Sequence, residues 1–429
     1  MRSLPATSPV SGNIIVPGDK SISHRAIMLG AIAEGITSVR GFLDGEDCLM
    51  TLRAFQAMGV HIDGPTSQCV VIHGVGKYGL QKPQQIIDCG NSGTTMRLLA
   101  GILVGQAFDS QLTGDESLCT RPMERISQPL MQMGAEISTT NGCAPLSIYG
   151  GKTLHGIRYT MPIASAQVKS CLLLAGLYAH GETCIIESKP TRDHTERMMS
   201  TLSYPIHQAE NMSMITSGNG VGTEIIVPGD ISAAAFFIVA ATIIPGSVLQ
   251  IKQVGLNNTR IGIIKILQQM GADITIIKTE MYGEELVGDL IVKYAPIRGI
   301  VIPEALVPLA IDEFPIIFIA AACAEGQTVL RGARELRHKE SDRILAMVQG
   351  LQTLGIDAED LDDGVLIRGG SLHGGTVDSY MDHRIAMSFV IAGAAASTPV
   401  TILNTESIKT SFPNFVQLAN TVNLNIMPF

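Results

Sequence analysis

The chain has 429 residues, 46% of them hydrophobic and 16% charged, so it can bury more than one sizeable core. A net charge of −9 excludes the broad basic face of a general nucleic-acid-binding protein. The eight Cys residues form no C-x-x-C pair, which excludes zinc-finger spacing. No apolar stretch is long enough for a membrane span, and the N-terminus lacks a signal-peptide core, so we expect a cytoplasmic protein.

In chain order, the first recurring pattern is an Ala-rich apolar segment, a small turn and a β-branched run, seen first at 28–39. Further copies, about six in all, occur at 98–112, 172–186, 237–251, 318–330 and 390–403. These segments carry too little polar surface for an exposed helix. The sequence therefore predicts helices buried in the centre of each domain, each followed by a strand.

A second pattern lies between these copies: an amphipathic helix that ends at a Gly before a strand, at Gly59, Gly134, Gly271 and Gly355. A degenerate copy at 201–205 has Pro in place of a smooth continuation. Each repeat is thus predicted to be strand, helix, strand, helix and one or two more strands. Six repeats divide naturally into two domains of three.

The two halves of the chain also resemble each other, because the segment 16–19 (Val-Pro-Gly-Asp) recurs at 227–230. Lys20, Ser21 and Arg25 follow the first copy, whereas the second is followed by the apolar segment 231–236. A Lys and an Arg at a helix N-terminus suit an anion. The first copy is therefore the predicted ligand site, although a solvated helix start would look similar.

Other polar segments interrupt the apolar helices at their ends, and each can be either a binding element or an ordinary solvated turn. They are the Gly-rich turn 88–97, the loop 115–122, the helix entrance 164–170, the charged runs 191–197 and 337–343, and the segments 382–384 and 409–413. Asp312 and Glu313 stand in an apolar stretch. Buried carboxylates need a partner or a function, and acid–base catalysis is one such function.

Taken in order, these motifs make the chain similar to 5-enolpyruvylshikimate-3-phosphate synthases over essentially its whole length. The resemblance is carried by Gly18–Arg25, Gly90–Thr94, Arg121-Pro122, Ser165–Gln167, Lys339–Arg343 and Asp382–Arg384. The segments 164–170 and 191–196 resemble the class II bacterial subgroup. Ala166 departs from class I enzymes, where a second Ser is common, so one phosphate contact is expected to be missing or replaced.

The resemblance implies a two-domain inside-out α/β barrel, with six βαβαββ repeats, three per domain, and the active site in the interdomain cleft. It assigns residues 19–228 to the domain on the shikimate-3-phosphate side, and 1–18 with 229–429 to the second domain. It implies two small-molecule substrates, no cofactor, no metal, no nucleic-acid or membrane partner, and a monomer. It also implies a cytoplasmic shikimate-pathway enzyme that glyphosate targets at the phosphoenolpyruvate site.

Binding residues carry over position by position. For shikimate-3-phosphate the resemblance implies Lys20, Ser21, Arg25, Ser165, Gln167, Arg192, Asp312 and Lys339. For phosphoenolpyruvate it implies Lys20, Gly93, Arg121, Gln167, Arg343, Arg384 and Lys409. Clustered cations would thus let an acidic protein bind two phosphorylated substrates.

The implied reaction adds the 5-hydroxyl of shikimate-3-phosphate to C2 of phosphoenolpyruvate and then expels phosphate. Glu340 is the expected acid that protonates C3, and Asp312 the expected base near the hydroxyl, with Lys20 sharing proton transfer. Whether Asp312, Glu313 or Lys20 handles the hydroxyl proton stays open. Because a C–O bond breaks, no Lewis acid is expected.

The main alternative is UDP-N-acetylglucosamine enolpyruvyl transferase, which shares the fold. Its mobile loop carries a Cys five residues before an Arg-Pro pair, where this chain has Glu116, and Cys119 is misplaced. It also lacks the runs that this chain has at 20–25 and 339–343. A binding scaffold without activity would have lost cations or the carboxylates Asp312 and Glu340, and none is lost.

Overall fold

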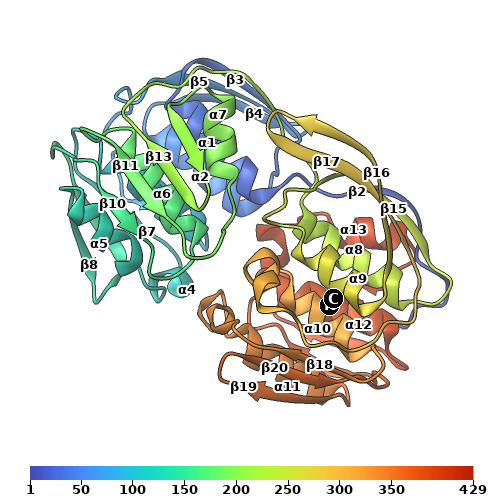
Figure 1. Ribbon diagram of the computed structural model, residues 1–429. Coiled ribbons are helices and arrows are strands. Elements are labelled where there is room, and N and C mark those ends of the chain that lie inside the picture. Colours follow the sequence, from blue (N-terminus) through green and yellow to red (C-terminus); the bar gives the residue numbers. More distant parts are fainter. Residues whose placement is uncertain (429) are drawn as a thin grey trace. The chain divides into compact units, whose positions relative to one another are not determined.

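The computed structural model describes residues 1–428, and they form two compact units (Figure 1). The central unit comprises residues 18–227 with 282–285, and the terminal unit comprises 1–17, 228–281 and 286–429. The sequence had assigned 282–285 to the second domain. They contact the central unit instead, where Glu285 Oε1 lies 2.6 Å from His194 Nδ1.

The central unit contains helices α1 (Lys20–Ala31), α2 (Glu46–Ala57), α3 (Gly93–Leu103), α4 (Glu116–Cys119), α5 (Glu124–Gln132), α6 (Ala166–Gly176) and α7 (His194–Thr201). Its strands are β3 (Glu34–Arg40), β4 (His61–Thr66), β5 (Cys69–Val75), β6 (Ile87–Asp88), β7 (Ser110–Thr113), β8 (Glu136–Thr140), β9 (Cys143–Tyr149), β10 (Arg158–Thr160), β11 (Thr183–Ile186), β12 (Ile206–Ala209), β13 (Met212–Ile215) and β14 (Glu224–Ile226).

The terminal unit contains helices α8 (Ile231–Ile243), α9 (Gly262–Met270), α10 (Phe314–Ala322), α11 (Arg343–Thr353), α12 (His383–Ala395) and α13 (Phe415–Thr421), with 3₁₀ turns η1 (Glu304–Leu306), η2 (Pro308–Ala310), η3 (Arg334–His338) and η4 (Thr405–Thr410). Its strands are β1 (Arg2–Ser3), β2 (Ser11–Ile15), β15 (Val248–Gly255), β16 (Asp273–Tyr282), β17 (Glu285–Lys293), β18 (Gln327–Leu330), β19 (Asp357–Leu361), β20 (Gly364–Arg368), β21 (Gly375–Asp378), β22 (Val400–Leu403) and β23 (Ile426–Met427).

The strands form six small sheets. Those of the central unit have the orders β14-β3-β5-β4, β6-β7-β9-β8 and β10-β11-β13-β12, and those of the terminal unit β2-β15-β17-β16, β18-β20-β19 and β21-β22-β1-β23. In every four-stranded sheet the first two strands run parallel. In the three-stranded sheet, a parallel bridge from Val301 to Val329 takes the place of that first strand. The expected two-domain α/β fold built from repeats is therefore confirmed.

In each unit, one sheet is completed by a strand that lies far from its neighbours in the sequence. The first strand beside β3 is β14, which comes from the end of the central segment, and the first strand beside β15 is β2 from the N-terminus. The N-terminal strand β1 lies between β22 and β23 and completes the last sheet. Each unit thus has its first strand supplied from a distant part of the chain.

The apolar helices occupy the cores, as their composition predicted. Helices α1, α3 and α6 contribute to one core cluster, and α8, α10 and α12 to the other. The amphipathic helices end where the sequence predicted, at glycines with a positive φ, such as Gly134 at 100° and Gly271 at 104°. In the degenerate copy Ser203 takes that place with φ of 60°, so the turn survives without Gly.

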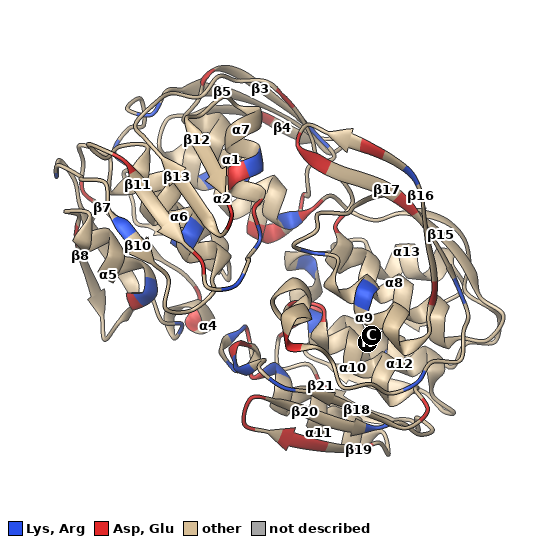
Figure 2. Ribbon diagram, viewed as in Figure 1, with Lys and Arg blue, Asp and Glu red and all other residues tan. Residues whose placement is uncertain are grey.

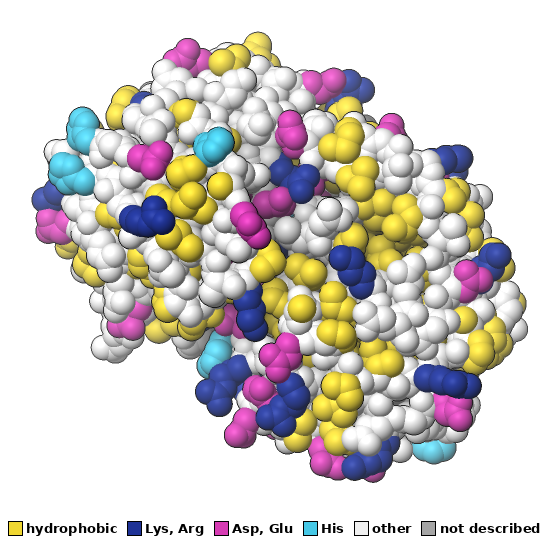
Figure 3. Space-filling view, in the orientation of Figure 1, with side chains coloured by type: hydrophobic (Ala, Val, Ile, Leu, Met, Phe, Trp, Pro, Cys, Tyr) yellow, Lys and Arg dark blue, Asp and Glu magenta, His cyan; other side chains and the backbone are white. Residues whose placement is uncertain are grey.

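On the face shown in Figure 3, basic and acidic side chains are interspersed among apolar ones. Within the described part of the chain, no helix is both long enough and apolar enough to span a bilayer.

Candidate functional site

The first predicted segment begins α1 in the central unit. Asp19 ends the preceding turn, and its Oδ1 accepts a hydrogen bond from the Ile22 amide at 2.9 Å, so the helix starts at Lys20. The Lys20 ammonium forms an ion pair with Asp47 at the start of α2. Only 18% of the Lys20 side chain is exposed. Asp47 is a partner that the sequence missed, because two acids in the first turn of a helix usually only complement its dipole.

Arg25, one turn further along α1, is buried and bonds to protein groups. Its Nε lies 2.6 Å from Thr195 Oγ1, Nη2 lies 2.9 Å from Ser170 Oγ, and Nη1 lies 2.9 Å from the Ser21 carbonyl oxygen. The guanidinium thus connects α1 with α6 and α7. A direct contact of Arg25 with substrate stays a prediction.

A buried chain of hydrogen bonds connects α1 with the Gly-rich turn. His24 Nδ1 lies 2.7 Å from Thr51 Oγ1, which lies 2.7 Å from Thr95 Oγ1, which in turn lies 2.7 Å from Ser92 Oγ. Ser92 begins α3 by accepting the Thr95 amide. Burial lowers the pKa of His24 well below its ordinary value, and the positive charges of Lys20 and Arg25 lower it further. The imidazole is therefore neutral at pH 7.

Two guanidinium groups lie beside the N-terminus of α3, where Gly93 is the first residue. A Cβ atom at position 93 would lie 3.3 Å from Arg121 Nη1 and 3.6 Å from Arg97 Nη1. Arg97 also donates to Gln167 Oε1, and Gln167 Nε2 donates to Thr94 Oγ1 at 3.1 Å. Two cations beside helix amide groups are suited to an anion. Arg97 was not among the predicted binding residues, because an Arg on a helix commonly has a structural partner.

The predicted residue Ser165 begins α6, accepting the Val168 amide at 3.4 Å. Lys169, one turn later, is almost fully buried, and its Nζ lies 2.7 Å from both Glu187 Oε2 and Glu196 Oε1. Burial lowers the pKa of Lys169, but the two carboxylates outweigh it, so the net pKa is raised and the group is charged. Lys169 therefore fixes α6 against β11 and α7.

Arg192 lies half-buried in the segment that leads into α7. The preceding residue, Thr191, donates its amide to Glu187 Oε1 at 3.1 Å, so the Lys169 carboxylate partner also orders this segment. In the central unit, Arg97, Arg121 and Gln167 thus lie around the N-terminus of α3, while Lys20 begins α1 beside Asp47. Figure 2 marks the charged positions along the ribbon.

In the terminal unit, Asp312 lies among three cations. Its Oδ1 is 3.3 Å from Lys339 Nζ and 3.5 Å from Arg343 Nη1, and its Oδ2 is 3.9 Å from Arg384 Nη2. Figure 2 shows acidic and basic segments side by side near α10. The sequence predicted all four residues, and the structure brings them together from three separate parts of the chain.

Arg343, the first residue of α11, is the most enclosed cation of this group. Its Nη2 lies 2.6 Å from Glu340 Oε2, and its Nε lies 2.8 Å from Asp382 Oδ2. Burial lowers the pKa of Arg343, but the charges of Asp382, Glu340 and Asp312 outweigh it and raise the pKa. Asp382 was not predicted as a site residue, although it stands in the quoted segment 382–384.

Glu313 differs from its neighbour Asp312 in its surroundings. Its carboxylate is 1% exposed, accepts a hydrogen bond from Ser232 and lies 3.4 Å from Arg260 Nη2, whereas Asp312 is 13% exposed. Ser232 follows the second copy of the Val-Pro-Gly-Asp segment, where apolar residues stand in place of the charged residues that begin α1. The structure therefore buries Glu313 in a hydrogen bond with Ser232, at the start of α8, and an ion pair with Arg260.

Lys409 lies exposed in η4, after β22. Ser21 and Arg192 are half-buried. The substrate-binding roles of Lys409, Ser21 and Arg192 stay predictions.

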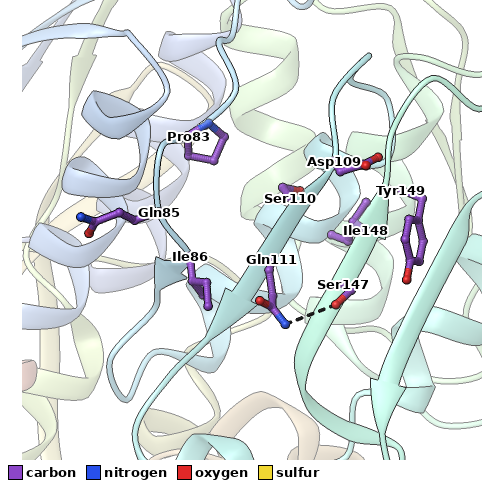
Figure 4. Close-up of a pocket in the computed structure, with 9 residues that line it drawn as sticks. All are labelled: Pro83, Gln85, Ile86, Asp109, Ser110, Gln111, Ser147, Ile148 and Tyr149. Carbon is purple, nitrogen blue, oxygen red and sulfur yellow. Dashed lines mark hydrogen bonds between the residues drawn. The ribbon is translucent and has the colours of Figure 1, made fainter.

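A groove of about 310 Å³ lies elsewhere on the central unit, beside β7 and β9 (Figure 4). Its lining includes Ile86, Asp109, Gln111 and Tyr149, and Gln111 Nε2 donates to Ser147 Oγ at 3.3 Å. Neither a predicted site residue nor any Lys or Arg is among its lining residues. The groove therefore lacks the positive charge that two phosphorylated substrates require.

Comparison with known sequences identifies the family. The model described as EPSP synthase (3-phosphoshikimate 1-carboxyvinyltransferase) matches residues 4–418. The 3-phosphoshikimate 1-carboxyvinyltransferase of Legionella pneumophila strain Philadelphia 1 is 63% identical over 419 residues, which cover 97% of this chain and 96% of that protein. The protein of the same name from Methylococcus capsulatus is 60% identical over 419 residues, again covering 97% and 96%.

Solved structures agree with this assignment. A structure of EPSP synthase from Acinetobacter baumannii has a TM-score of 0.89 and 54% identity, covering 99% of this chain and 98% of that one. The enolpyruvyl transferase NikO from Streptomyces tendae has a TM-score of 0.80 at 15% identity, covering 99% and 98%, and shows a shared fold only. The chain belongs to the EPSP synthase (3-phosphoshikimate 1-carboxyvinyltransferase) family.

Proposed function

We propose that this chain transfers the enolpyruvyl group of phosphoenolpyruvate to the 5-hydroxyl of shikimate-3-phosphate and releases phosphate. The observation that carries the proposal is the ring of Lys339, Arg343 and Arg384 around Asp312, within 4 Å of its carboxylate oxygens. A carboxylate held by three cations resembles the bound state of an anionic substrate. Family membership supports the identity of the substrates.

The central unit supplies the second set of cations. Lys20, Gly93 and Gln167 lie in the first turns of its buried helices. Arg121 follows α4, and its Nη2 donates to Asn91 Oδ1 at 3.1 Å, which orients its guanidinium. We assign phosphoenolpyruvate to these residues together with Arg343, Arg384 and Lys409. Preoriented cations stabilise developing negative charge without further reorganisation.

Shikimate-3-phosphate is assigned to the remaining groups of both units. They are Lys20, Ser21, Arg25, Ser165, Gln167, Arg192, Asp312 and Lys339. Ser165 already accepts the Val168 amide, so its hydroxyl hydrogen is directed away from that bond and suits a phosphate oxygen.

The proposed reaction proceeds by addition and elimination. The hydroxyl oxygen bonds to C2 of phosphoenolpyruvate and gives up its proton to Asp312, while Glu340 delivers a proton to C3 and makes it a methyl group. In the tetrahedral intermediate, the Glu340 carboxylate then takes back a proton from the methyl group while phosphate leaves by C–O cleavage, which restores the double bond. Lys20 shares proton transfer at the hydroxyl. Burial of Glu313 against Ser232 and Arg260 favours Asp312 over Glu313 as the base.

We also propose a cytoplasmic location and a monomeric state. The cysteines are free thiols, and Cys48, Cys89 and Cys171 are buried. Free thiols are typical of a reducing compartment.

The test measures phosphate release from phosphoenolpyruvate, with shikimate-3-phosphate or UDP-N-acetylglucosamine as the acceptor. We expect release with the first acceptor alone, and loss of most activity in Arg384→Gln. The matched control is Arg368→Gln, since Arg368 is an exposed cation paired with Asp357 and Glu359 on β19. Release with UDP-N-acetylglucosamine alone would assign the alternative reaction.

A further inference from the structure

Two histidines and an aspartate meet on the outer face of the hairpin formed by β4 and β5. His61 and Asp63 are two residues apart on β4, and His73 is the residue paired with His61 across the hairpin. The intervening Ile62 and its partner Ile72 are buried, so strand alternation directs the three polar side chains to the opposite face. No predicted site residue belongs to this hairpin.

The geometry of this His–Asp–His cluster matches that of metal ligands. His61 Nε2 lies 3.2 Å from Asp63 Oδ1, and His73 Nε2 lies 3.1 Å from Asp63 Oδ2. The two imidazole rings have centroids 4.8 Å apart, and one ligand atom from each residue fits within 4.8 Å of the other two. Zinc bonds of about 2.0–2.2 Å in a tetrahedron place ligand atoms about 3.3–3.5 Å apart. Small side-chain rotations would therefore bring all three onto one ion.

We propose that His61, Asp63 and His73 form a site for a divalent transition-metal cation such as Zn²⁺. Two imidazoles and one carboxylate leave a fourth tetrahedral position for water. Without metal, Asp63 Oδ2 is hydrogen-bonded to His73 Nε2, and its Oδ1 lies 3.2 Å from His61 Nε2. On binding, the cation replaces the Nε2 protons and takes over the carboxylate, so the site is preformed by the hairpin register.

The proposal departs from the expectation of no metal that the resemblance implied. His-x-Asp on one strand is a weak signal, and the third ligand comes from the neighbouring strand, so the site depends on strand register. β4 is the edge strand of its sheet, in the order β14-β3-β5-β4. A cation that joins β4 to β5 would stabilise this edge of the central unit, because it binds only the folded hairpin. The site has no role in the proposed reaction.

The experiment is a Zn²⁺ titration of the full chain, freed of metal by a chelator, in competition with a chromophoric chelator. Wild-type protein is expected to bind one equivalent, and His61→Ala and His73→Ala to bind it at least about tenfold more weakly. His155→Ala is the matched control, since His155 and His180 are exposed and pair in an isolated parallel bridge, with ring centroids 6.3 Å apart.

A second measurement follows thermal unfolding with and without Zn²⁺. The midpoint is expected to rise for wild type and His155→Ala, and to stay constant for His73→Ala. All variants should retain enolpyruvyl transfer in the presence of chelator, which verifies that they are folded. Equal Zn²⁺ affinity in wild type and both ligand variants would overturn the proposal, as would the absence of any one-equivalent binding to wild type.

Discussion

Asp382 positions Arg343 and begins α12 with the same carboxylate. Its Oδ2 lies 2.8 Å from Arg343 Nε, and its Oδ1 accepts the Arg384 amide at 2.9 Å. Neither side chain of the pair is more than 1% exposed. One buried acid therefore fixes the places of two arginines that we assign to phosphoenolpyruvate.

Replacing Asp382 by Asn should destabilise the protein, because Arg343 would lose the most deeply buried of its carboxylate partners. We expect the free energy of unfolding to fall by about 3 kcal/mol, measured by urea denaturation. The control is Asp357→Asn, which removes one partner of the exposed cation Arg368, 3.0 Å away, and should have no measurable effect. Equal stability of Asp382→Asn and wild type would show that Arg343 is held by its other carboxylates.

Glu340→Gln should slow turnover while both substrates still bind. Glu340 Oε2 lies 2.6 Å from Arg343 Nη2, and the Gln amide oxygen can keep that hydrogen bond but cannot deliver a proton to C3. Loss of a general acid lowers kcat about a hundredfold or more. Steady-state kinetics would show a low kcat with little change in KM. The exposed Glu359→Gln serves as control, and a near-normal kcat in Glu340→Gln would remove this residue from the mechanism.

His24 should make the protein less stable in mild acid. Its pKa is lowered in the folded state by burial first and by Lys20 and Arg25 next, so the unfolded chain takes up a proton that the folded chain does not. As pH falls below about 6.5, the free energy of unfolding should therefore drop by about 1.4 kcal/mol per pH unit, until the folded-state pKa is reached.

Denaturation of His24→Gln at several pH values tests this expectation. The variant should lose part of that slope, so the stability difference from wild type should shrink as the pH falls from 7.5 to 5.5. His207→Gln, which changes an exposed imidazole, should keep the wild-type slope. Parallel profiles for His24→Gln and wild type would contradict a neutral buried His24.

Gly93→Ala should weaken inhibition by glyphosate more than it weakens binding of phosphoenolpyruvate. Glyphosate is slightly longer than the substrate, and the added Cβ would lie 3.3 Å from Arg121 Nη1, within the space beside the helix N-terminus. The close neighbours are the side chains of Arg121, Arg97 and Leu118, which can shift, so folding should persist.

Inhibition constants and KM values of wild type and Gly93→Ala provide the measurement. Wild type should be inhibited competitively with phosphoenolpyruvate. The class II resemblance favours tolerance, while the open position at Gly93 favours sensitivity. An inhibition constant already far above KM in wild type would show that a feature other than Gly93 determines the sensitivity to glyphosate.

Much of the fold could be read from the sequence because burial and helix termination leave local patterns. The Ala-rich apolar copy at 237–251 predicted a buried helix followed by a strand, and Gly59 or Gly355 marked where an amphipathic helix ends. The repeat number followed from these patterns alone. The origin of the first strand in each unit did not, since β14 and β2 join their sheets across long stretches of chain; the resemblance suggested it for β2 alone.

The sequence by itself determined which segments carry charge at the ends of buried helices, and it marked Lys20, Gly93, Asp312 and Arg343 as positions worth inspecting. Only the tertiary structure decided how charges pair. Asp47 with Lys20, Asp382 with Arg343, and Glu313 with Ser232 each join side chains from different elements. The physical reason is the distance along the sequence over which each interaction acts. Hydrophobic periodicity and capping act within a few residues, whereas an ion pair or a His–Asp–His cluster depends on strand register and helix packing that local sequence does not encode.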